Sequence, residues 1–253
     1  MKKMEVSAVL IVKNEAHHLR RILPALAWCD ETVIIDDFSD DDTLSVCKDF
    51  GCRIFQHKLE GFGAQKQLGV QQATHDWILS IDADEAFSPD LIDEIRQILP
   101  ATNEDTGGYA IRRKHMFMGK VFHHSMESRK FYLRLFNRQK AGFNDAKVHE
   151  TVETVYKVAH LKNFFIHYSF DNIDHYLRKQ NFYTSIAAEE YYQKGKQKNM
   201  LVVLLTTPFV FLQRYILHLN ILEGMPGFAW ALFQCWFRTV KYMKLFEKTH
   251  YKP

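Results

Sequence analysis

Acidic side chains gather in two clusters, each directly after an apolar run of strand length. One cluster occupies residues 36–42 behind a β-branched run, and the other consists of Asp82, Asp84 and Glu85. Carboxylates that meet at one edge of a sheet repel one another unless a cation or hydrogen-bond donors lie between them. Mg²⁺ and Mn²⁺ prefer such hard oxygen ligands and commonly bridge carboxylates to substrate phosphates. The clusters therefore predict a site for a divalent metal and a phosphorylated ligand.

The members of each cluster have different expected roles. Asp82 and Asp84 share one side of an extended chain, so one can bind the metal while the other binds a hydroxyl or a metal-bound water. For residues 40–42 the alternative is structural, because carboxylates there can cap the following helix at its positive end.

The elements that position these clusters follow from the apolar periodicity of the first hundred residues. Strands are expected at 6–12, 32–35, 52–57 and 77–81, and helices at 19–26, 43–50, 64–73 and 90–99. Alternation of strands and helices with short connections predicts βαβ units, and hence an α/β fold whose mostly parallel sheet is flanked by helices. Ligands bind at the carboxyl ends of the strands in such sheets, which is where both clusters fall.

The pattern changes after Gly107-Gly108. Extended segments are expected at 109–118, 131–138, 148–155 and 163–168, and helices follow from residue 172 onward. Residues 200–212 are uncharged and strongly apolar, but we expect this run to be too short to span a bilayer before Arg214, and Pro208 to kink a helix there. The amphipathic tail that follows is consistent either with a membrane interface or with core helices of a C-terminal subdomain.

Charge is divided unevenly along the 253 residues, although the net charge is only +3. Residues 1–110 contain 10 Lys and Arg against 20 Asp and Glu, whereas residues 111–253 contain 23 against 10. An acidic half suits metal or sugar hydroxyls and a basic half suits phosphates or an anionic membrane, unless solvated charges cluster by chance. Four cysteines without a CxxC pair exclude a disulfide framework and a zinc ribbon, and the first residues do not form a signal peptide, so we expect a cytoplasmic protein.

Four motifs follow one another in a fixed order: Lys13-Asn14-Glu15, Asp36-Asp37 with Ser39, Asp41 and Thr43, Gly63-Ala64-Gln65-Lys66-Gln67, and Asp82 with Asp84. With residues 132–138, 148–150, 166–169 and 214–228, they make nearly the whole chain resemble the family-2 inverting glycosyltransferases of the GT-A fold. The resemblance is greatest to the branch that builds lipopolysaccharide core, which includes the β-1,4-glucosyltransferase type. It implies a Rossmann-like GT-A domain over residues 1–170, with a nucleotide-sugar half (1–107) and an acceptor half (108–170). Residues 171–253 would form a helical extension that is basic and aromatic.

The resemblance also implies which residues bind the donor and the metal. A nucleotide sugar, expected to be a UDP-sugar, would be bound by Val12, Asn14, Glu15, Asp36, Asp37, Gln65, Lys66, Asp82 and Arg134. Either Asp36 or Asp37 would hold the base or ribose, and the alternative for Lys66 is a surface position on its helix. A divalent metal, Mn²⁺ or Mg²⁺, would be bound by Asp84, Asp82 and His167, where a structural histidine is the alternative for His167.

Inverting transfer needs a carboxylate that deprotonates the acceptor hydroxyl while a cation stabilises the departing nucleoside diphosphate. This base must lie across the sugar from the leaving group, so we expect it in the second half of the chain. Glu150 is the candidate, and His149 would orient it or share the proton. The alternative for Glu150 is an exposed acid at the end of a strand.

Two departures from the family pattern concern the donor turn and the acceptor. Phe38 stands where relatives commonly have glycine, which predicts an altered turn. Residues 123–129 do not follow the stretch expected near the acceptor, which we expect to be a saccharide or a lipid-linked saccharide. The expected location is the cytoplasm, with peripheral contact of the C-terminal region at the cytoplasmic face of the inner membrane.

Two other classes of function compete with this interpretation. A sugar nucleotidyltransferase would carry a glycine-rich loop after the first strand, and the chain has none there. A catalytically inactive, membrane-associated protein that binds nucleotide sugars would keep the same pockets. No nucleic-acid partner is expected, because the basic residues are dispersed.

Overall fold

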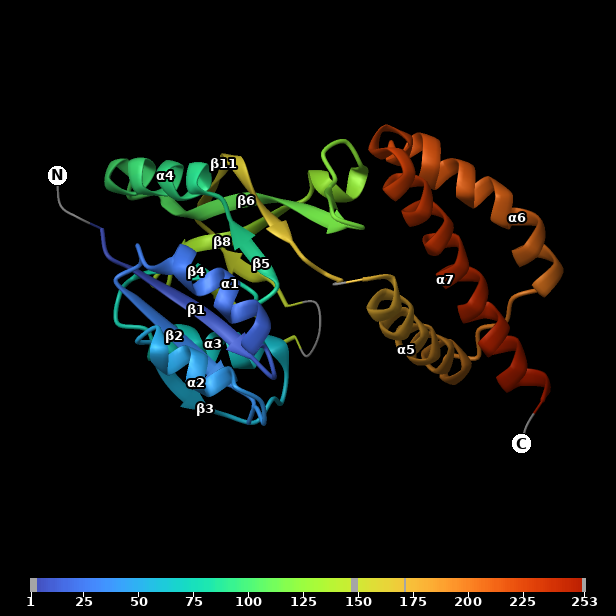
Figure 1. The fold of residues 1–253 in the computed structure, drawn as a ribbon, viewed down its shortest axis with the longest axis horizontal. Coiled ribbons are helices and arrows are strands. Elements are labelled where there is room, and N and C mark those ends of the chain that lie inside the picture. The colour runs from blue at the N-terminus through green and yellow to red at the C-terminus, as the bar shows by residue number, and fades with distance from the viewer. Residues whose placement is uncertain (1–3, 147–149, 171, 252–253) are drawn as a thin grey trace. The chain divides into compact units, whose positions relative to one another are not determined.

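The computed structural model describes residues 4–146, 150–170 and 172–251 of the chain. These residues form two compact units (Figure 1). Unit 1 comprises residues 1–113 and 130–167, and unit 2 comprises residues 114–129 and 168–253. The chain therefore passes between the units three times, so neither unit is one continuous piece of sequence.

A mixed sheet forms the centre of unit 1. Its parallel part has the order β3-β2-β1-β4 and consists of β1 (Val6–Val12), β2 (Glu31–Asp36), β3 (Arg53–Gln56) and β4 (Trp77–Ser80). The sheet continues through β8 (Phe131–Asn137), β6 (Thr106–Phe117), β11 (Lys157–His167) and β5 (Glu85–Phe87). The pairs β4–β8, β8–β6 and β11–β5 are antiparallel. The α/β fold is confirmed, and the sheet is mixed, with parallel strands in its first half and antiparallel pairs in its second half.

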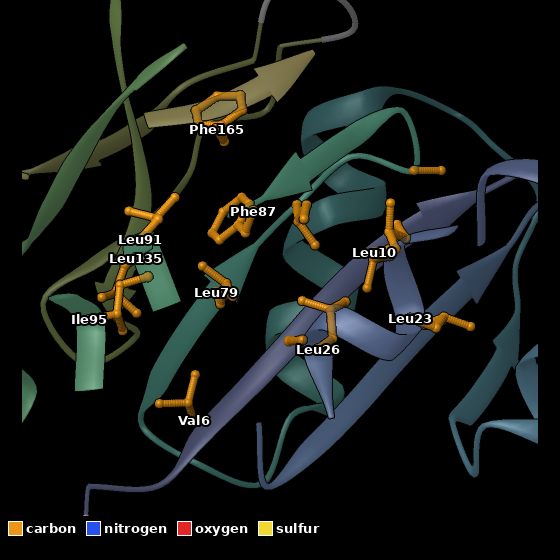
Figure 2. Packing of buried hydrophobic residues seen from close by; sticks show 14 of the residues in the cluster. Val6, Leu10, Leu23, Leu26, Leu79, Phe87, Leu91, Ile95, Leu135 and Phe165 are labelled. Atoms are coloured by element: carbon orange, nitrogen blue, oxygen red, sulfur yellow. The ribbon is translucent and has the colours of Figure 1, made fainter. Parts of the chain in front are cut away.

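The helices of unit 1 cover the sheet because alternate strand residues point to opposite faces. One buried cluster joins β1 to α1 (Ala16–Leu26), α2 (Thr43–Asp49) and α4 (Pro89–Ile98), and Figure 2 shows its packing around Leu10, Leu26 and Phe87. A second cluster joins the other face to α3 (Phe62–Gln72). The expected start of α4 is confirmed, since the Ser88 hydroxyl accepts a hydrogen bond from the Leu91 N–H at 3.2 Å.

Short elements complete the architecture. They are the strand β7 (Lys120–Val121), the two-stranded pair β9 (Ala141–Phe143) and β10 (Val152–Thr154), and the 3₁₀ turns η1 (Leu99–Ala101) and η2 (Met126–Arg129). The strand pair β9–β10 flanks the segment that ends at Glu150.

Unit 2 is helical and has an aromatic core of its own. Its elements are α5 (Ile173–Gln193), α6 (Met200–Leu212), the π-helical turn η3 (Gln213–Leu217), the 3₁₀ turn η4 (Asn220–Glu223) and α7 (Gly224–His250). Phe117 and Phe122 pack with Tyr176, and Trp230 lies against this cluster. The expected C-terminal helices are therefore present.

The apolar run at residues 200–212 forms α6 (Met200–Leu212), and the helical backbone extends beyond it. The helical backbone does not stop at Arg214 but continues through η3, and Pro208 lies inside α6. By length and composition, residues Met200–Leu217 suffice to cross a membrane.

Candidate active site

The loops after β1 and β2 are tied to each other at the carboxyl ends of these strands. The Asn14 N–H donates to the Ser39 hydroxyl at 2.9 Å, and the Asn14 side-chain oxygen accepts from the Asp40 N–H at 2.9 Å. The Glu15 N–H donates to the Thr43 hydroxyl at 2.8 Å. Val12 accepts a backbone hydrogen bond from Asp37, the residue directly after β2. The first two sequence motifs therefore form one rigid edge of the sheet.

Asp36 and Asp37 differ in what their carboxylates contact. Asp36 is fully buried and accepts hydrogen bonds from the Ser39 hydroxyl at 2.5 Å and from the Gln56 amide at 3.0 Å. Asp37 lies at the surface of the edge and accepts from the Leu59 N–H at 3.0 Å, which together with the nearby Lys13 ammonium holds the pKa of Asp37 below its usual value. Asp36 shapes the turn, whereas Asp37 is the more exposed of the two carboxylates.

Phe38, between Asp37 and Ser39, adopts the left-handed backbone conformation that glycine favours, with a φ of 52°. Its ring is 56% exposed, so no packing compensates this conformation. The turn thus keeps the backbone geometry of a glycine turn and adds an exposed aromatic ring beside Asp37.

Other sequence-predicted residues of this edge brace the loops. Gln65 is buried, and its amide donates to the His57 carbonyl at 2.7 Å while its oxygen lies 2.8 Å from the His57 ring nitrogen. The Glu15 carboxylate lies 2.5 Å from the His18 ring. Asp41 accepts from the Thr43 N–H at 2.9 Å at the start of α2, whereas Asp42, the N-cap residue, makes no side-chain capping hydrogen bond.

Lys66 lies at the centre of a buried charged cluster. Its side chain is 5% exposed, and its ammonium lies 2.7 Å from a carboxylate oxygen of Asp82 and 2.7 Å from one of Glu150. The alternative of a surface lysine is therefore wrong. The Lys66 ammonium thus joins α3 to Asp82, which follows β4, and to Glu150, which follows β9. Lys66 and Glu150 are 84 positions apart in the sequence.

Arg134 of β8 completes the cluster from the other side of Asp82. Its guanidinium lies 2.7 Å from the second carboxylate oxygen of Asp82 and also contacts Glu85. Glu85 in turn accepts a hydrogen bond from the Asp82 N–H at 3.1 Å. These five side chains, Lys66, Asp82, Glu85, Arg134 and Glu150, come from separate segments of the chain. The antiparallel pairing of β8 with β4 brings Arg134 to the acidic motif.

The protonation of the cluster follows from its charges. Although burial opposes ionisation, Arg134 and Lys66 hold the pKa of Asp82 well below its usual range. Burial raises the pKa of Glu85 to about 7, and the neighbouring charge of Asp82 acts in the same direction while Arg134 opposes it. When Glu85 is protonated, the cations Lys66 and Arg134 face the carboxylates of Asp82 and Glu150, so the charges of the cluster cancel. Sequence analysis gave Glu85 no role, although its place directly behind Asp84 was a signal.

Asp84 and His167 meet beside this cluster. The Asp84 carboxylate lies 3.0 Å from the His167 ring nitrogen, and both side chains are partly exposed. Antiparallel pairing of β11 with β5 places His167 opposite Glu85, which explains why a residue 83 positions away reaches the acidic motif. One carboxylate and one imidazole are donors that Mn²⁺ accepts. Asp82, the third expected ligand, is instead engaged by Lys66 and Arg134.

A metal at this place would need further ligands from the substrate. Among residues 4–146, 150–170 and 172–251, no group of three or more His, Cys, Asp or Glu side chains is arranged to hold an ion. The Asp84–His167 pair fits a metal that is shared with a diphosphate, since such ions commonly bridge protein carboxylates and substrate phosphates. The expected catalytic partner His149 lies outside the described residues.

Comparison with known proteins identifies the family and several relatives of this chain. Residues 7–165 match the family model for glycosyl transferase family 2. An uncharacterised glycosyltransferase of Rickettsia typhi is 28% identical over 98% of this chain and 88% of its own length. The lipopolysaccharide core biosynthesis glycosyltransferase LpsC of Rhizobium meliloti is 27% identical over 91% of this chain and 87% of its own length.

The fold also has a counterpart among solved structures. Residues 1–349 of S. aureus TarS superpose with a TM-score of 0.51 at 14% identity, covering 98% of this chain and 92% of that chain. At this identity the likeness shows the fold alone, and it confirms a GT-A arrangement. The family match covers the strands and loops that carry the charged cluster, and this chain belongs to glycosyl transferase family 2.

Proposed function

We propose that this protein transfers a sugar from a nucleotide-diphosphate donor, a UDP-sugar, to a saccharide or lipid-linked acceptor with inversion. The proposed setting is lipopolysaccharide core or related cell-surface glycan synthesis, for which the similarity to LpsC is the support. The observation that carries the proposal is the meeting of Lys66, Asp82, Arg134 and Glu150 at the carboxyl ends of the sheet strands. We further propose that residues 1–170 contain this chemistry, that 171–253 serve membrane contact, and that the enzyme acts at the cytoplasmic face of the inner membrane.

The donor would bind along the edge formed by the first two loops. Asp37 can accept a hydrogen bond from a base imide or a ribose hydroxyl, because it is the more exposed of the two aspartates. Asn14 holds the loop that carries this edge, and Phe38 offers an exposed ring beside it. Lys66 and Arg134 supply two positive charges for a diphosphate, and Asp82 keeps both of them in place.

Departure of a nucleoside diphosphate requires neutralisation of its growing charge. Asp84 and His167 would hold Mn²⁺ or Mg²⁺, which would supply that positive charge when bound. Lys66 and Arg134 add to it from the protein.

Glu150 is proposed as the base that takes the proton from the acceptor hydroxyl. Its side chain is 16% exposed, and the Lys66 ammonium at 2.7 Å holds the carboxylate in one orientation. Lys66 thereby links the donor side of the site to the base, and we regard it as the residue that positions Glu150. His149 precedes Glu150 in the sequence and keeps its proposed role as a partner of this base.

The experiment is release of nucleoside diphosphate from a panel of nucleotide sugars, with and without Mn²⁺ or Mg²⁺. We expect release for one UDP-sugar in the presence of metal, and loss of release in Asp84→Asn. Glu150→Gln should lose transfer to an acceptor while calorimetry with UDP still shows binding, because Glu150 acts on the acceptor. UDP binding without release from any donor would identify the inactive binding protein instead. Full activity of Asp84→Asn would refute the metal site.

A further inference from the structure

The helix α6 is apolar on its outer side. We call this side the outer α6 face and define it by eight side chains that are between 47% and 72% exposed: Leu201, Val202, Leu204, Leu205, Phe209, Leu212, Ile216 and Leu217. Residues Met200–Leu217 have a mean hydropathy of 1.7, yet only 6% of this segment is buried. Apolar side chains of this number are rarely left in water together, so the outer α6 face requires a partner.

The inner side of the same helix combines apolar packing, through the buried Val203 and through Phe211 against Phe228, with polar contacts to α7. The Arg238 guanidinium of α7 donates to the hydroxyls of Thr206 at 2.7 Å and Thr207 at 3.3 Å, and to the Val203 carbonyl at 3.3 Å. A helix at the surface of a water-soluble protein carries polar residues on its outer side, whereas α6 carries apolar residues there. The α6 helix is therefore built to meet an apolar medium on the side that faces away from its own unit.

Charge identifies the kind of partner. Residues 194–246 contain seven Lys and Arg residues and one acid, Glu223. Glu223 is buried, and its carboxylate accepts hydrogen bonds from the backbone N–H groups of His123 at 2.8 Å, His124 at 2.5 Å and Ser125 at 3.2 Å. Its negative charge is thus used inside unit 2. The segment that carries the outer α6 face therefore has a net positive charge, which matches anionic lipid headgroups and disfavours a second copy with the same charge.

The contacts between α6 and Arg238 of α7 also indicate whether α6 spans the bilayer or lies parallel to its surface. Thr206 and Thr207 are near the middle of α6, so a spanning α6 would carry the bound Arg238 guanidinium to the centre of the bilayer. A charge at that depth is costly. With α6 parallel to the surface, the outer face enters the lipid while Arg238 stays on the protein side.

We propose that the outer α6 face inserts into one leaflet of an anionic lipid bilayer, with α6 parallel to the membrane. Ile221, Leu222 and Met225, which follow α6 and are exposed, extend the inserted surface. Lys196 and Lys198, directly before α6, would lie at the level of the headgroups. This inference deepens the peripheral location proposed above, and it does not depend on the glycosyl-transfer chemistry of unit 1.

Co-sedimentation of the full chain with vesicles tests the inference. Vesicles of phosphatidylcholine alone are compared with vesicles that contain about 30% phosphatidylglycerol. We expect binding to the anionic vesicles, and a decrease of more than about tenfold in the double variant Leu205→Glu and Phe209→Glu. The control adds the same charges at two exposed apolar positions of unit 1, Phe50→Glu and Val155→Glu, and should bind as the unchanged protein does.

Three further measurements separate the outcomes. The double variant should keep its circular dichroism spectrum and its UDP binding, which distinguishes a membrane defect from failure of the proposed enzyme. Bound protein should be released by alkaline carbonate, and retention would overturn the parallel orientation in favour of a spanning helix. Lack of vesicle binding by the unchanged protein, or a concentration-dependent dimer that the double variant abolishes in ultracentrifugation, would overturn the lipid assignment.

Discussion

The contact between Lys66 and Glu150 predicts a measurable coupling between the two side chains. Lys66 is almost fully buried and serves two carboxylates, so Lys66→Met leaves the Glu150 charge without a partner. Breaking a buried ion pair from one side costs about 3–5 kcal/mol. We expect about 3 kcal/mol here, because Asp82 retains Arg134 and is itself 31% exposed.

The second variant removes the charge at the other end of the contact. Glu150→Gln should cost about 1 kcal/mol, since Lys66 still has Asp82 at 2.7 Å. In the double variant no carboxylate of Glu150 remains to be left unpaired. We therefore expect the double variant to be more stable than the sum of the single effects predicts, by about 1–2 kcal/mol.

Urea unfolding followed by circular dichroism and tryptophan fluorescence measures the four proteins of this cycle. The matched control is the exposed pair Lys194 and Glu190, whose side chains are 56% and 54% exposed and whose cycle should be additive. Additivity within about 0.5 kcal/mol for Lys66 and Glu150 would refute the contact, and with it the proposed link between donor site and base.

Three other substitutions test particular features of unit 1. The pKa of Glu85 is about 7 in the folded protein and 4.5 in the unfolded chain. Between pH 4.5 and pH 7, the folded protein therefore keeps a proton on Glu85 that the unfolded chain has released. Raising the pH from about 5.5 to 8.5 should therefore lower the free energy of unfolding of the unchanged protein by up to about 2 kcal/mol more than that of Glu85→Gln. An equal dependence of this free energy on pH in the two proteins would contradict the prediction. Phe38→Gly should raise the free energy of unfolding by about 0.5–1 kcal/mol in the same urea assay, because glycine has no penalty at a φ of 52°; a decrease would argue against that backbone conformation. Gly69→Ala should lower the free energy of unfolding by about 1–3 kcal/mol despite its better helix propensity, because the new Cβ would lie 2.5 Å from the Val9 side chain; an unchanged urea midpoint would show that α3 is less close to β1.

The parallel half of the sheet was predictable because each strand and the helix after it show their own periodicity. The first helix buries residues at helical spacing, and the strands at 6–12 and 32–35 are short apolar runs that are buried almost throughout. The strand β5 was not predicted, since three residues are too few to show a period. It exists because it pairs with β11, which lies about eighty residues later and cannot be inferred from local pattern.

In the candidate site, too, local sequence patterns could be predicted, whereas contacts between distant segments could not. The two acidic motifs were predictable from their place after strands, but the difference between Asp36 and Asp37 was not. It depends on Gln56 and Leu59, which belong to the next strand and the loop behind it. Likewise, the burial of Lys66 results from carboxylates supplied by other segments of the chain, and its own helix gives no sign of it.

The aromatic core of unit 2 determines when that unit can assemble during synthesis. Phe117 and Phe122 leave the ribosome early, but their partner Trp230 follows about a hundred residues later, which takes roughly 5–20 s at cellular rates. Until then the two rings on the 114–129 segment have no completed pocket, and the nascent chain presents them to chaperones. A protein shortened at residue 167 would keep them in this state permanently, so the sheet domain cannot be obtained by simple truncation without also replacing those rings.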